Sequence, residues 1–282
     1  MALRLGWFTT GRGPGSRGLL ATVHDEIAAG RLDAEIVVVL CNREPGQDQQ
    51  TDQLFEQARG YGLPVVHLST LRFRRERGES AAKADEALPE WRRDFDREVI
   101  RLLEPYPFDL GVLAGYMLIA TDVLCNRFDL LNLHPAAPDG PPGTWQGVIW
   151  WLMEKGADHS GVRMHLATTD LDMGPPVAYC TYPIRGPRLD DLWRDVERRG
   201  VAGVKAEDGE ENALFEEIRR QGVARELPLV VETLRGFAEG RVRVRDKRVL
   251  DAKGEAISGY DLTEEIERIV ARAKSQPENG QL

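Results

Sequence analysis

The feature that most constrains the fold is a continuous apolar run, Ile36-Val37-Val38-Val39-Leu40, within the segment 34–41. Unbroken runs of aliphatic residues are typical of strands covered on both faces, as in a parallel sheet between two helical layers. Shorter apolar runs occur at 4–8, 64–68, 110–114 and 130–133, separated by segments of helical periodicity at 16–29, 54–61 and 88–103. The alternation predicts an α/β fold, with a Rossmann-like, mostly parallel sheet and helices on both faces.

The second half of the chain indicates a different arrangement. Strands are expected at 162–166 and 177–182, then charged helical stretches at 189–199 and 210–234, the second interrupted at Pro228 because proline cannot donate a helical hydrogen bond. A hairpin at 241–250 and a helix at 263–273 come before a polar tail at 275–282, which is expected to fray. We therefore expect a main domain over 1–238 and a small C-terminal extension over 239–282. The charged segment 72–86 is interpreted as a solvated loop or an exposed helical arm.

Composition narrows the class of protein. The 282 residues are 42% hydrophobic, which is enough for a large core, and the net charge is −9. A negative chain has no overall attraction for nucleic acids or anionic membranes, so neither is expected as a partner. No apolar stretch reaches the roughly 18 residues that span a bilayer, and residues 1–8 lack the pattern of a signal peptide, so a cytoplasmic location is expected. The scattered Cys41, Cys125 and Cys180 indicate neither a zinc site nor a disulfide framework.

Candidate chemistry begins at the end of the strand expected at 130–133. Asn132 and His134 are two residues apart, so their side chains point to the same side of the strand. Ligands of open α/β sheets bind at this edge, and Pro135 ends the strand there. An Asn-x-His-Pro motif alone is weak, because a histidine at the end of a strand can equally be a packing residue.

A second motif strengthens the hypothesis. Asp172 lies in the loop 168–175, directly after the strand that contains His165. A carboxylate held against an imidazole raises the pKa of that imidazole, which would provide a general acid and a partner for a developing negative oxygen. We expect His165 to position the Asp172 loop, and the alternative is an ordinary core histidine.

In combination these motifs resemble the folate-dependent formyltransferase family. That family carries Asn-x-His-Pro at the end of a strand, then a Gly-x-x-x-His strand that leads to Leu-Asp-x-Gly-Pro. The matching segments here are 132–135, 161–165 and 171–175. The resemblance implies that 1–238 is the catalytic domain, that Asn132, His134 and Asp172 are the catalytic set, that 10-formyltetrahydrofolate is the formyl donor, and that no metal takes part.

The resemblance also implies a pocket for the donor. The segment Leu113-Ala114-Gly115-Tyr116-Met117 looks like the family segment that lines the folate pocket, and its alternative is an ordinary buried strand. The donor contacts implied in this way come from Leu113, Met117, Leu118, Ile119, Thr168, Asp170 and Met173.

A Gly-rich turn at 9–17 separates the first expected strand from the first expected helix. Backbone N–H groups at a helix N-terminus can hold a phosphate, although many turns of this kind need glycine for geometry alone. The family has a shorter Gly-x-Gly-Ser-Asn turn that binds the substrate phosphate, and Gly15-Ser16 match its end. The implied acceptor contacts are Gly13, Gly15, Ser16, Arg17 and, from the helix 88–103, Arg92. No Gly-Lys-Ser/Thr follows, so nucleotide hydrolysis is not expected.

The expected acceptor is a small phosphorylated amine, and the resemblance points first to glycinamide ribonucleotide of purine biosynthesis. Leu118, where the family commonly has arginine, and a charged insertion at 191–211 leave the acceptor open. Two rival activities on the same site, those of a sugar-nucleotide amine formyltransferase and of a formyltetrahydrofolate hydrolase, also leave the acceptor open. The hydrolases carry a regulatory domain ahead of the catalytic one, so a first strand at Arg4 favours transfer.

A rival from another class is a catalytically silent folate-binding or nucleotide-binding protein. The intact set of Asn132, His134 and Asp172 favours an enzyme, because binding alone does not need it. Whether the chain forms a homodimer is left open by the sequence.

Overall fold

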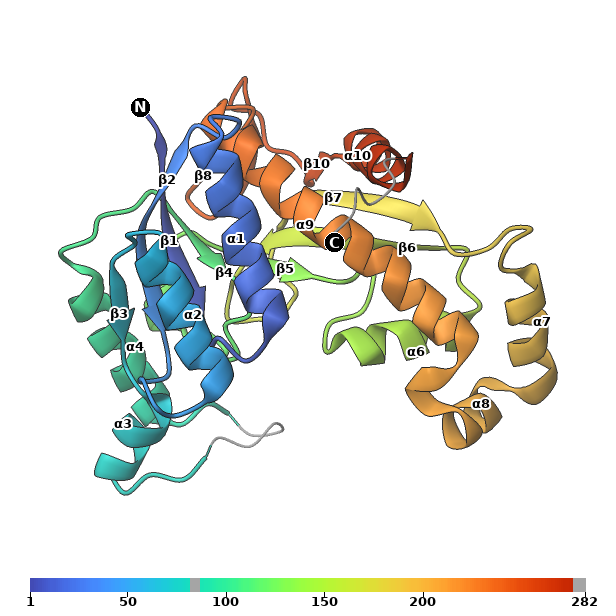
Figure 1. Ribbon diagram of the computed structural model, residues 1–282, viewed down its shortest axis with the longest axis horizontal. Coiled ribbons are helices and arrows are strands. Elements are labelled where there is room, and N and C mark those ends of the chain that lie inside the picture. Colours follow the sequence, from blue (N-terminus) through green and yellow to red (C-terminus); the bar gives the residue numbers. More distant parts are fainter. Residues whose placement is uncertain (82–86, 276–282) are drawn as a thin grey trace, which may run out of the picture.

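The computed structural model describes residues 1–81 and 87–275 and contains a central eight-stranded sheet in the order β10-β7-β6-β5-β4-β1-β2-β3 (Figure 1). The strands β1 to β5 are parallel to one another, β6 runs antiparallel to β5 and to β7, and β10 is parallel to β7. The expectation of a mostly parallel sheet is confirmed. Its strands are β1 (Leu3–Thr9), β2 (Ala34–Cys41), β3 (Val65–His67), β4 (Leu110–Leu113), β5 (Leu130–His134), β6 (His159–Leu166), β7 (Pro176–Pro183) and β10 (Tyr260–Asp261).

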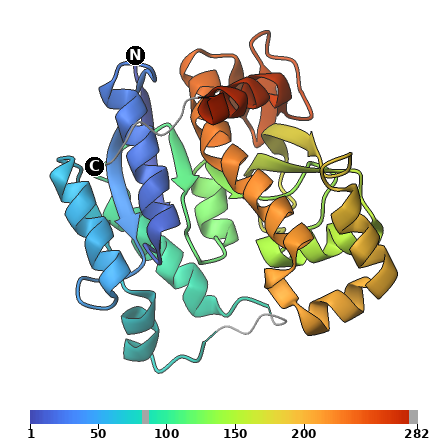
Figure 2. The ribbon, with the colours of Figure 1, turned by 45° about the vertical axis from the view of Figure 1, so that its right-hand side comes forward.

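Helices cover both faces of the sheet, as the sequence predicts (Figures 1 and 2). One face packs against α1, α2 and α9 in one hydrophobic cluster, and the other packs against α3, α4 and α5 in a second cluster. The helices are α1 (Pro14–Ala28), α2 (Gln49–Gly60), α3 (Thr70–Glu76), α4 (Glu90–Leu103), α5 (Asp122–Arg127), α6 (Trp145–Lys155), α7 (Asp190–Arg199), α8 (Val201–Glu207), the short 3-10 helix η1 (Gly209–Glu211), α9 (Ala213–Ala238) and α10 (Thr263–Ser275).

The apolar run in β2 explains why the sheet is central. Val38 packs in the cluster under α4, whereas Val39 packs in the cluster under α1 and α9, and both side chains are fully buried. Successive side chains of a strand point to opposite faces, so an unbroken apolar run requires a cover on each side.

Helix α9 corrects one expectation. It runs without a break for 26 residues, with Pro228 inside it, although an interruption was expected there. A proline removes one backbone hydrogen bond and costs about 3 kcal/mol in a helix interior. The buried side chains of Leu229, Val230 and Leu234 follow directly, and α9 lies across β6 and β7. Packing on the sheet therefore keeps the helix continuous through the proline.

The C-terminal extension is a hairpin of β8 (Val242–Arg245) and β9 (Arg248–Asp251), followed by β10 and α10. The short strand β10 pairs with β7 and so becomes the edge of the main sheet. Two segments with sequence expectations, 82–86 of the charged arm and 276–282 of the tail, lie outside the described residues. No helix in the described part of the chain is long and apolar enough to cross a membrane.

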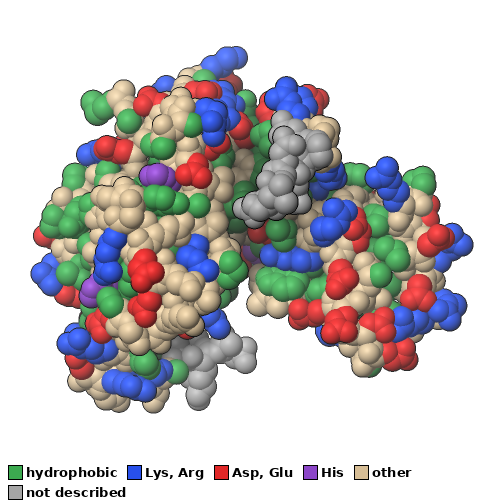
Figure 3. Space-filling model, in the orientation of Figure 1, with side chains coloured by type: hydrophobic (Ala, Val, Ile, Leu, Met, Phe, Trp, Pro, Cys, Tyr) green, Lys and Arg blue, Asp and Glu red, His purple; other side chains and the backbone are tan. Residues whose placement is uncertain are grey.

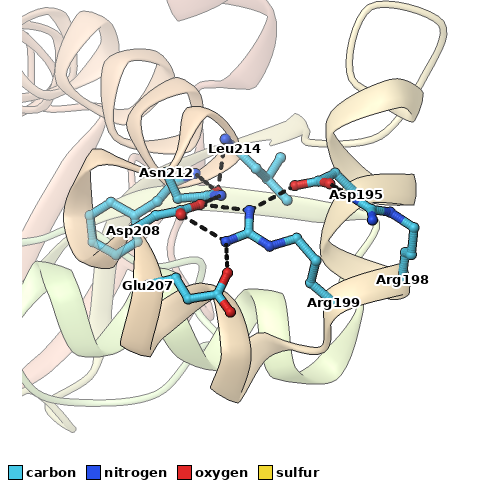
Figure 4. Close-up of polar contacts among 8 residues, drawn as sticks. Asp195, Arg198, Arg199, Glu207, Asp208, Asn212 and Leu214 are labelled. Atoms are coloured by element: carbon cyan, nitrogen blue, oxygen red, sulfur yellow. Dashed lines mark hydrogen bonds and ion pairs between the residues drawn. The ribbon is translucent and has the colours of Figure 1, made fainter.

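The charged insertion at 191–211 folds into α7, α8 and η1 around the guanidinium of Arg199 (Figure 4). Arg199 donates to Asp195 at 3.0 Å, to Glu207 at 2.8 Å and to Asp208 at 2.7 and 2.8 Å. Asn212 donates to Asp208 at 3.0 Å and caps α9 by accepting from the first-turn N–H groups. The insertion is therefore fixed to the start of α9 by side-chain contacts.

Candidate active site

A cavity of about 490 Å³ lies where the C-terminal ends of β1, β4 and β5 meet. The molecule is visibly hollowed between the part that carries α1 to α4 and the part that carries α6 to α9 (Figure 3). The cavity walls come from the start of α1, the loop after β4, the end of β5 and the loop after β6. This is the sheet edge at which open α/β folds bind ligands.

The pairing of β5 with β6 collects polar side chains on one face of the sheet. Asn132 lies opposite His165, and His134 lies opposite Arg163. The intervening residues of both strands point the other way, and Met164 packs in the cluster under α9. The register therefore separates a polar face, which faces the cavity, from an apolar face, which belongs to the core.

Asp172 joins this face because its loop folds back over the strands. Its carboxylate accepts from the amide of Asn132 at 3.2 Å and from the backbone N–H of Gly143 at 3.2 Å. Its oxygens lie 3.7 Å from Nδ1 of His134 and 3.7 Å from Nε2 of His165. Asp172 has a φ of 56°, a left-handed conformation that aspartate tolerates better than most residues. The structure thus brings together Asn132, His134 and Asp172, with His165 beside them.

Nearby, Gly174 allows the return of the loop. A Cβ atom on this glycine would overlap the carbonyl oxygen of Leu166, so the backbone can approach the strand only without a side chain. The glycine of the Leu-Asp-x-Gly-Pro motif therefore has a steric cause in this fold.

The carboxylate of Asp172 is ionised near neutral pH. Burial raises its pKa, but the neighbouring imidazoles of His165 and His134 and the N–H of Gly143 outweigh burial and lower the pKa below its ordinary value. A lowered pKa means that the site favours the negative form of this group.

His134 behaves differently from the sequence expectation. Its Nε2 lies 2.8 Å from the carbonyl oxygen of Pro141, and because a carbonyl only accepts, Nε2 carries the hydrogen. Burial lowers the pKa of His134, and this outweighs the opposing effects of Pro141 and Asp172, while Arg163 and His165 lower it further. Asp172 does raise the imidazole pKa, as expected, but burial outweighs this effect and the net pKa of His134 is lowered. The lowered pKa favours the neutral imidazole, whose Nδ1 faces Asp172 and can take up a proton.

The expected donor contacts fall into two groups. Leu113, Met117, Leu118, Ile119 and Thr168 line the cavity. Asp170 and Met173 do not: the carbonyl of Asp170 accepts from the hydroxyl of Thr168 at 3.2 Å, and Met173 is 61% exposed outside the lining.

Arg92 also lies away from the cavity, in contrast to the expectation that it contacts the acceptor. Arg92 is 3% exposed, and its Nη2 donates to the carbonyl of Ile119 at 2.9 Å. One helical turn along α4, the fully buried Asp96 accepts from the N–H of Thr121 at 2.8 Å. Both side chains anchor the backbone of the loop after β4 from behind. Arg92 thus holds a cavity wall instead of reaching into the cavity.

The Gly-rich turn contributes only part of its predicted set. Helix α1 begins at Pro14, and Gly15 and Ser16 line the cavity, whereas Gly13 and Arg17 do not. The Arg17 guanidinium donates to the side chain of Gln50 at 2.7 Å. No side-chain hydrogen bond caps the start of α1 at Gly13, so its first N–H groups can bind an anion.

The sequence assigned no individual role to three further residues, of which Thr10 lies in the Gly-rich turn and Gly115 in the segment 113–117 that was expected to line the pocket. Thr10 donates through its N–H to Gly115 at 3.0 Å and accepts from Met117 at 2.8 Å, joining the turn before α1 to the loop after β4. Gly115 has a φ of 69°, and an added Cβ would lie 2.6 Å from the hydroxyl oxygen of Ser16. Arg163 is 2% exposed and bonds to backbone carbonyls of both loops beside the cavity. The two-residue alternation Gly161, Arg163, His165 is a signal that could have placed Arg163 on the cavity face.

The residues 1–81 and 87–275 contain no group of three or more His, Cys, Asp or Glu side chains arranged to hold a metal ion. Cys41, Cys125 and Cys180 are buried and free, and burial raises the pKa of each thiol.

The sequence profile of the formyl transferase family matches residues 13–199, which is more than half of the chain. The chain therefore belongs to the formyl transferase family. Together with the α/β sheet described above, this confirms the class and the fold that the motifs predicted.

Relatives and solved structures agree with this assignment. A phosphoribosylglycinamide formyltransferase of Haemophilus influenzae is 26% identical over 249 residues, covering 86% of this chain and 92% of the relative. The enzyme of that name from Escherichia coli is 27% identical over 173 residues, covering 60% of this chain and 68% of the relative.

Two solved structures share the fold. A phosphoribosylglycinamide formyltransferase of Coxiella burnetii has a TM-score of 0.64 at 20% identity and covers 93% of this chain and 99% of its own. A formyltetrahydrofolate deformylase of Burkholderia mallei has a TM-score of 0.58 at 17% identity and covers 89% of this chain and 70% of its own. Solved structures called phosphoribosylglycinamide formyltransferase and formyltetrahydrofolate deformylase thus share this fold.

Proposed function

We propose that this protein transfers the formyl group of 10-formyltetrahydrofolate to an amine that carries a phosphate, with glycinamide ribonucleotide as the first candidate. The observation that carries the proposal is the convergence of Asn132, His134 and Asp172 on a cavity whose other wall is the start of α1. The volume of about 490 Å³ is in the ordinary range for a small-molecule site.

One end of the cavity has an apolar wall, which suits a flat ring, and the other end carries the polar side chains that would take part in the reaction. Leu113, Leu118 and Ile119 give an apolar wall, backed by Arg92 and Asp96. Asn132 and His134 lie on the polar face. The donor supplies the formyl group to this polar end, and the remaining steps belong to residues of the chain.

Asn132 can stabilise negative charge. One N–H of its amide is held by Asp172, which orients the amide in the cavity. Its other N–H lies toward Nε2 of His165 at 3.3 Å, and in the proposed reaction the oxygen that becomes negative when an amine adds to a formyl carbon competes with His165 for this N–H. A preorganised donor of this kind lowers the activation free energy by about 2.7–4 kcal/mol.

His134 moves the proton. The neutral imidazole takes the proton released by the attacking amine at Nδ1, and Asp172 stabilises the imidazolium across the 3.7 Å that separates Nδ1 from its carboxylate. His134 then returns this proton to the nitrogen of the leaving tetrahydrofolate, so that no net proton is gained or lost. The carbonyl of Pro141 keeps the ring in one orientation throughout.

The acceptor is proposed from the opposite wall. Gly15 and Ser16 place first-turn N–H groups of α1 on the cavity, and a helix N-terminus stabilises a phosphate through these groups and its dipole. The two relatives named above, which are called phosphoribosylglycinamide formyltransferases, support a phosphorylated amine as acceptor.

The test is a panel of amines with 10-formyltetrahydrofolate, followed by the release of tetrahydrofolate and the mass of the formylated product. We expect amine-dependent release, with the highest kcat/KM for glycinamide ribonucleotide. Release of tetrahydrofolate with formate and without any amine would replace the proposal by a hydrolase. Turnover of another amine alone would keep the reaction and change the acceptor.

A further inference from the structure

The residue opposite His134 in the register is a buried arginine. Arg163 on β6 is 2% exposed, and its guanidinium has no carboxylate as a direct hydrogen-bond partner among the described residues. It donates to backbone carbonyls instead: Nη1 to Ala137, and Nη2 to Asp172 at 2.8 Å. A buried cation costs several kcal/mol unless it is paired or hydrogen-bonded, so these bonds compensate for its burial.

The two carbonyls belong to different loops of the site. The loop 136–143 supplies the carbonyl of Pro141 to His134 and the N–H of Gly143 to Asp172. The loop 167–175 supplies Asp172 itself. A guanidinium is a planar fork with fixed angles between its N–H groups, so one that bonds to both loops fixes one loop relative to the other.

Close packing leaves this guanidinium little freedom. A Cβ added to Gly161, two residues earlier on the same face of β6, would lie 2.9 Å from the Cα of Ala137. A Cβ on Gly140 would lie 2.8 Å from the Cβ of Ala136. The loop 136–143 therefore lies directly on β6, and the side chain of Arg163 ends against its backbone.

We propose that Arg163 is a positioning residue of this site, which ties the loop 136–143 to the loop 167–175 and thereby sets the geometry between His134 and Asp172. This inference rests on the proposed function to the extent that these two residues act together in formyl transfer. The Gly-x-x-x-His pattern of the family leaves position 163 unspecified, so the resemblance does not assign the role.

The charge of Arg163 gives the inference an independent readout. The charged and titratable groups that act on His134 are Asp172, Arg163 and His165, and those that act on Arg163 are Asp172 and Asp139. The positive charge of Arg163 lowers the pKa of His134. Removing this charge should therefore raise the pKa of His134. A general loss of packing would also raise it by exposing the imidazole, so Arg163→Lys, which keeps the charge, separates the two effects.

The experiment compares Arg163→Met, Arg163→Lys and a matched control, Arg225→Met. Arg225 is 4% exposed and donates to Glu267 at 2.6 and 3.0 Å, but it lies on α9 outside the cavity lining. Removing it deletes a buried guanidinium of similar size without touching either loop. For each protein we would measure kcat, kcat/KM against pH, and the thermal midpoint.

For Arg163→Met we expect kcat to fall by about 100-fold, as a misplacement of reacting groups by about 1 Å can cause. The acid-limb midpoint of kcat/KM should move to higher pH. Arg163→Lys keeps the charge and loses the fork, so its midpoint should stay parental while kcat falls by a smaller factor. Arg225→Met should keep the parental kcat and midpoint.

A parental kcat in folded Arg163→Met, or an equal loss in Arg225→Met, overturns the proposal. If Arg163→Met does not fold, Arg163→Lys decides: a parental kcat at parental thermal stability also overturns it. A readout without turnover is the titration of His134 by NMR, assigned among the 5 histidines with His134→Gln. An unchanged His134 pKa on removal of the Arg163 charge contradicts the inference even if the proposed reaction proves wrong. A pKa that is raised in Arg163→Met and parental in Arg163→Lys supports it in the same circumstance.

Discussion

Two regions of the molecule are each organised by one arginine, and they use it in opposite ways. In the region of the cavity, Arg163 is 2% exposed and its guanidinium binds backbone carbonyls. In the insertion, the side chain of Arg199 is 21% exposed and binds the carboxylates of Asp195, Glu207 and Asp208. The first arginine fixes loops, and the second gathers side chains.

The difference shows which region can hold chemical groups at fixed distances and angles. Backbone carbonyls move only with the chain, so bonds to them hold a loop in one place and are little affected by salt. Carboxylates near the surface can rotate, exchange partners and be screened, and such pairs contribute little to stability individually. The network holds the pKa of Asp208 down at about 2 and reaches the start of α9 through Asn212.

The largest effect that would separate the two regions is the loss of turnover in His134→Ala and Asp172→Asn. We expect kcat to fall by about 10² to 10³, the usual cost of removing one group that stabilises the transition state. Asparagine tolerates the left-handed backbone at 172, so the loop should survive. Folate-analogue binding by calorimetry should stay near the parental value, and Arg199→Met should keep the parental kcat. Parental turnover in Asp172→Asn would contradict the proposed role.

A smaller effect is expected behind the donor wall. Asp96→Ala removes the acceptor for the N–H of Thr121, and we expect the donor KM to rise by about tenfold, equivalent to one buried hydrogen bond of about 1.4 kcal/mol. Asp96→Asn keeps an accepting oxygen, so the donor KM should rise less in this variant. The control is Arg93→Gln, which breaks the surface contact of α4 with Asp122. An equal rise of the donor KM in this control would show that the two contacts do not differ.

The pH dependence of the parental enzyme tests the electrostatics of the cavity. Below the pKa of His134 the imidazole is protonated and cannot take a proton from the amine, so kcat/KM should fall as the pH falls. Because burial lowers this pKa, the midpoint of the acid limb should lie below the ordinary value of 6.5. A midpoint above that value would show that the free site holds an imidazolium, as the sequence alone suggested.

The insertion should respond to salt, in contrast to the cavity. Arg199→Met removes the centre of the carboxylate network, so the thermal midpoint should fall at low ionic strength, and the difference from the parent should shrink in about 1 M salt. Scans at both salt concentrations measure this. A difference that does not depend on salt would indicate that packing of the Arg199 stem matters more than its charge.

The smallest effect concerns Arg17. Its guanidinium binds Gln50 and lies outside the cavity lining, so Arg17→Ala should leave the acceptor KM within about twofold. Ser16→Ala, on the wall itself, should raise the KM of phosphorylated acceptors more. A large rise in Arg17→Ala alone would show that this side chain turns toward the phosphate during the reaction.

The sequence predicted those features that depend on one local pattern. The run in β2 required a covered strand, and the spacing of Asn132 and His134 placed both on one side of β5. It could not predict features that depend on tertiary contacts: Arg92 is one more charged residue in a charged helix until the loop after β4 packs against it. Pro228 likewise breaks a helix in isolation but not against the sheet.

The antiparallel register of β5 and β6 has a consequence for how this protein can diverge. Deleting one residue between Gly161 and His165 would turn Arg163 toward α9 and bring apolar side chains to the cavity, so the length of this stretch is fixed. The loop 136–143 and the insertion contain no strand, so a change in their length does not move alternate side chains to the opposite face. The strands that hold the reacting groups therefore admit only substitutions, whereas the insertion 191–211, which lies outside the cavity lining, can change in length without this effect.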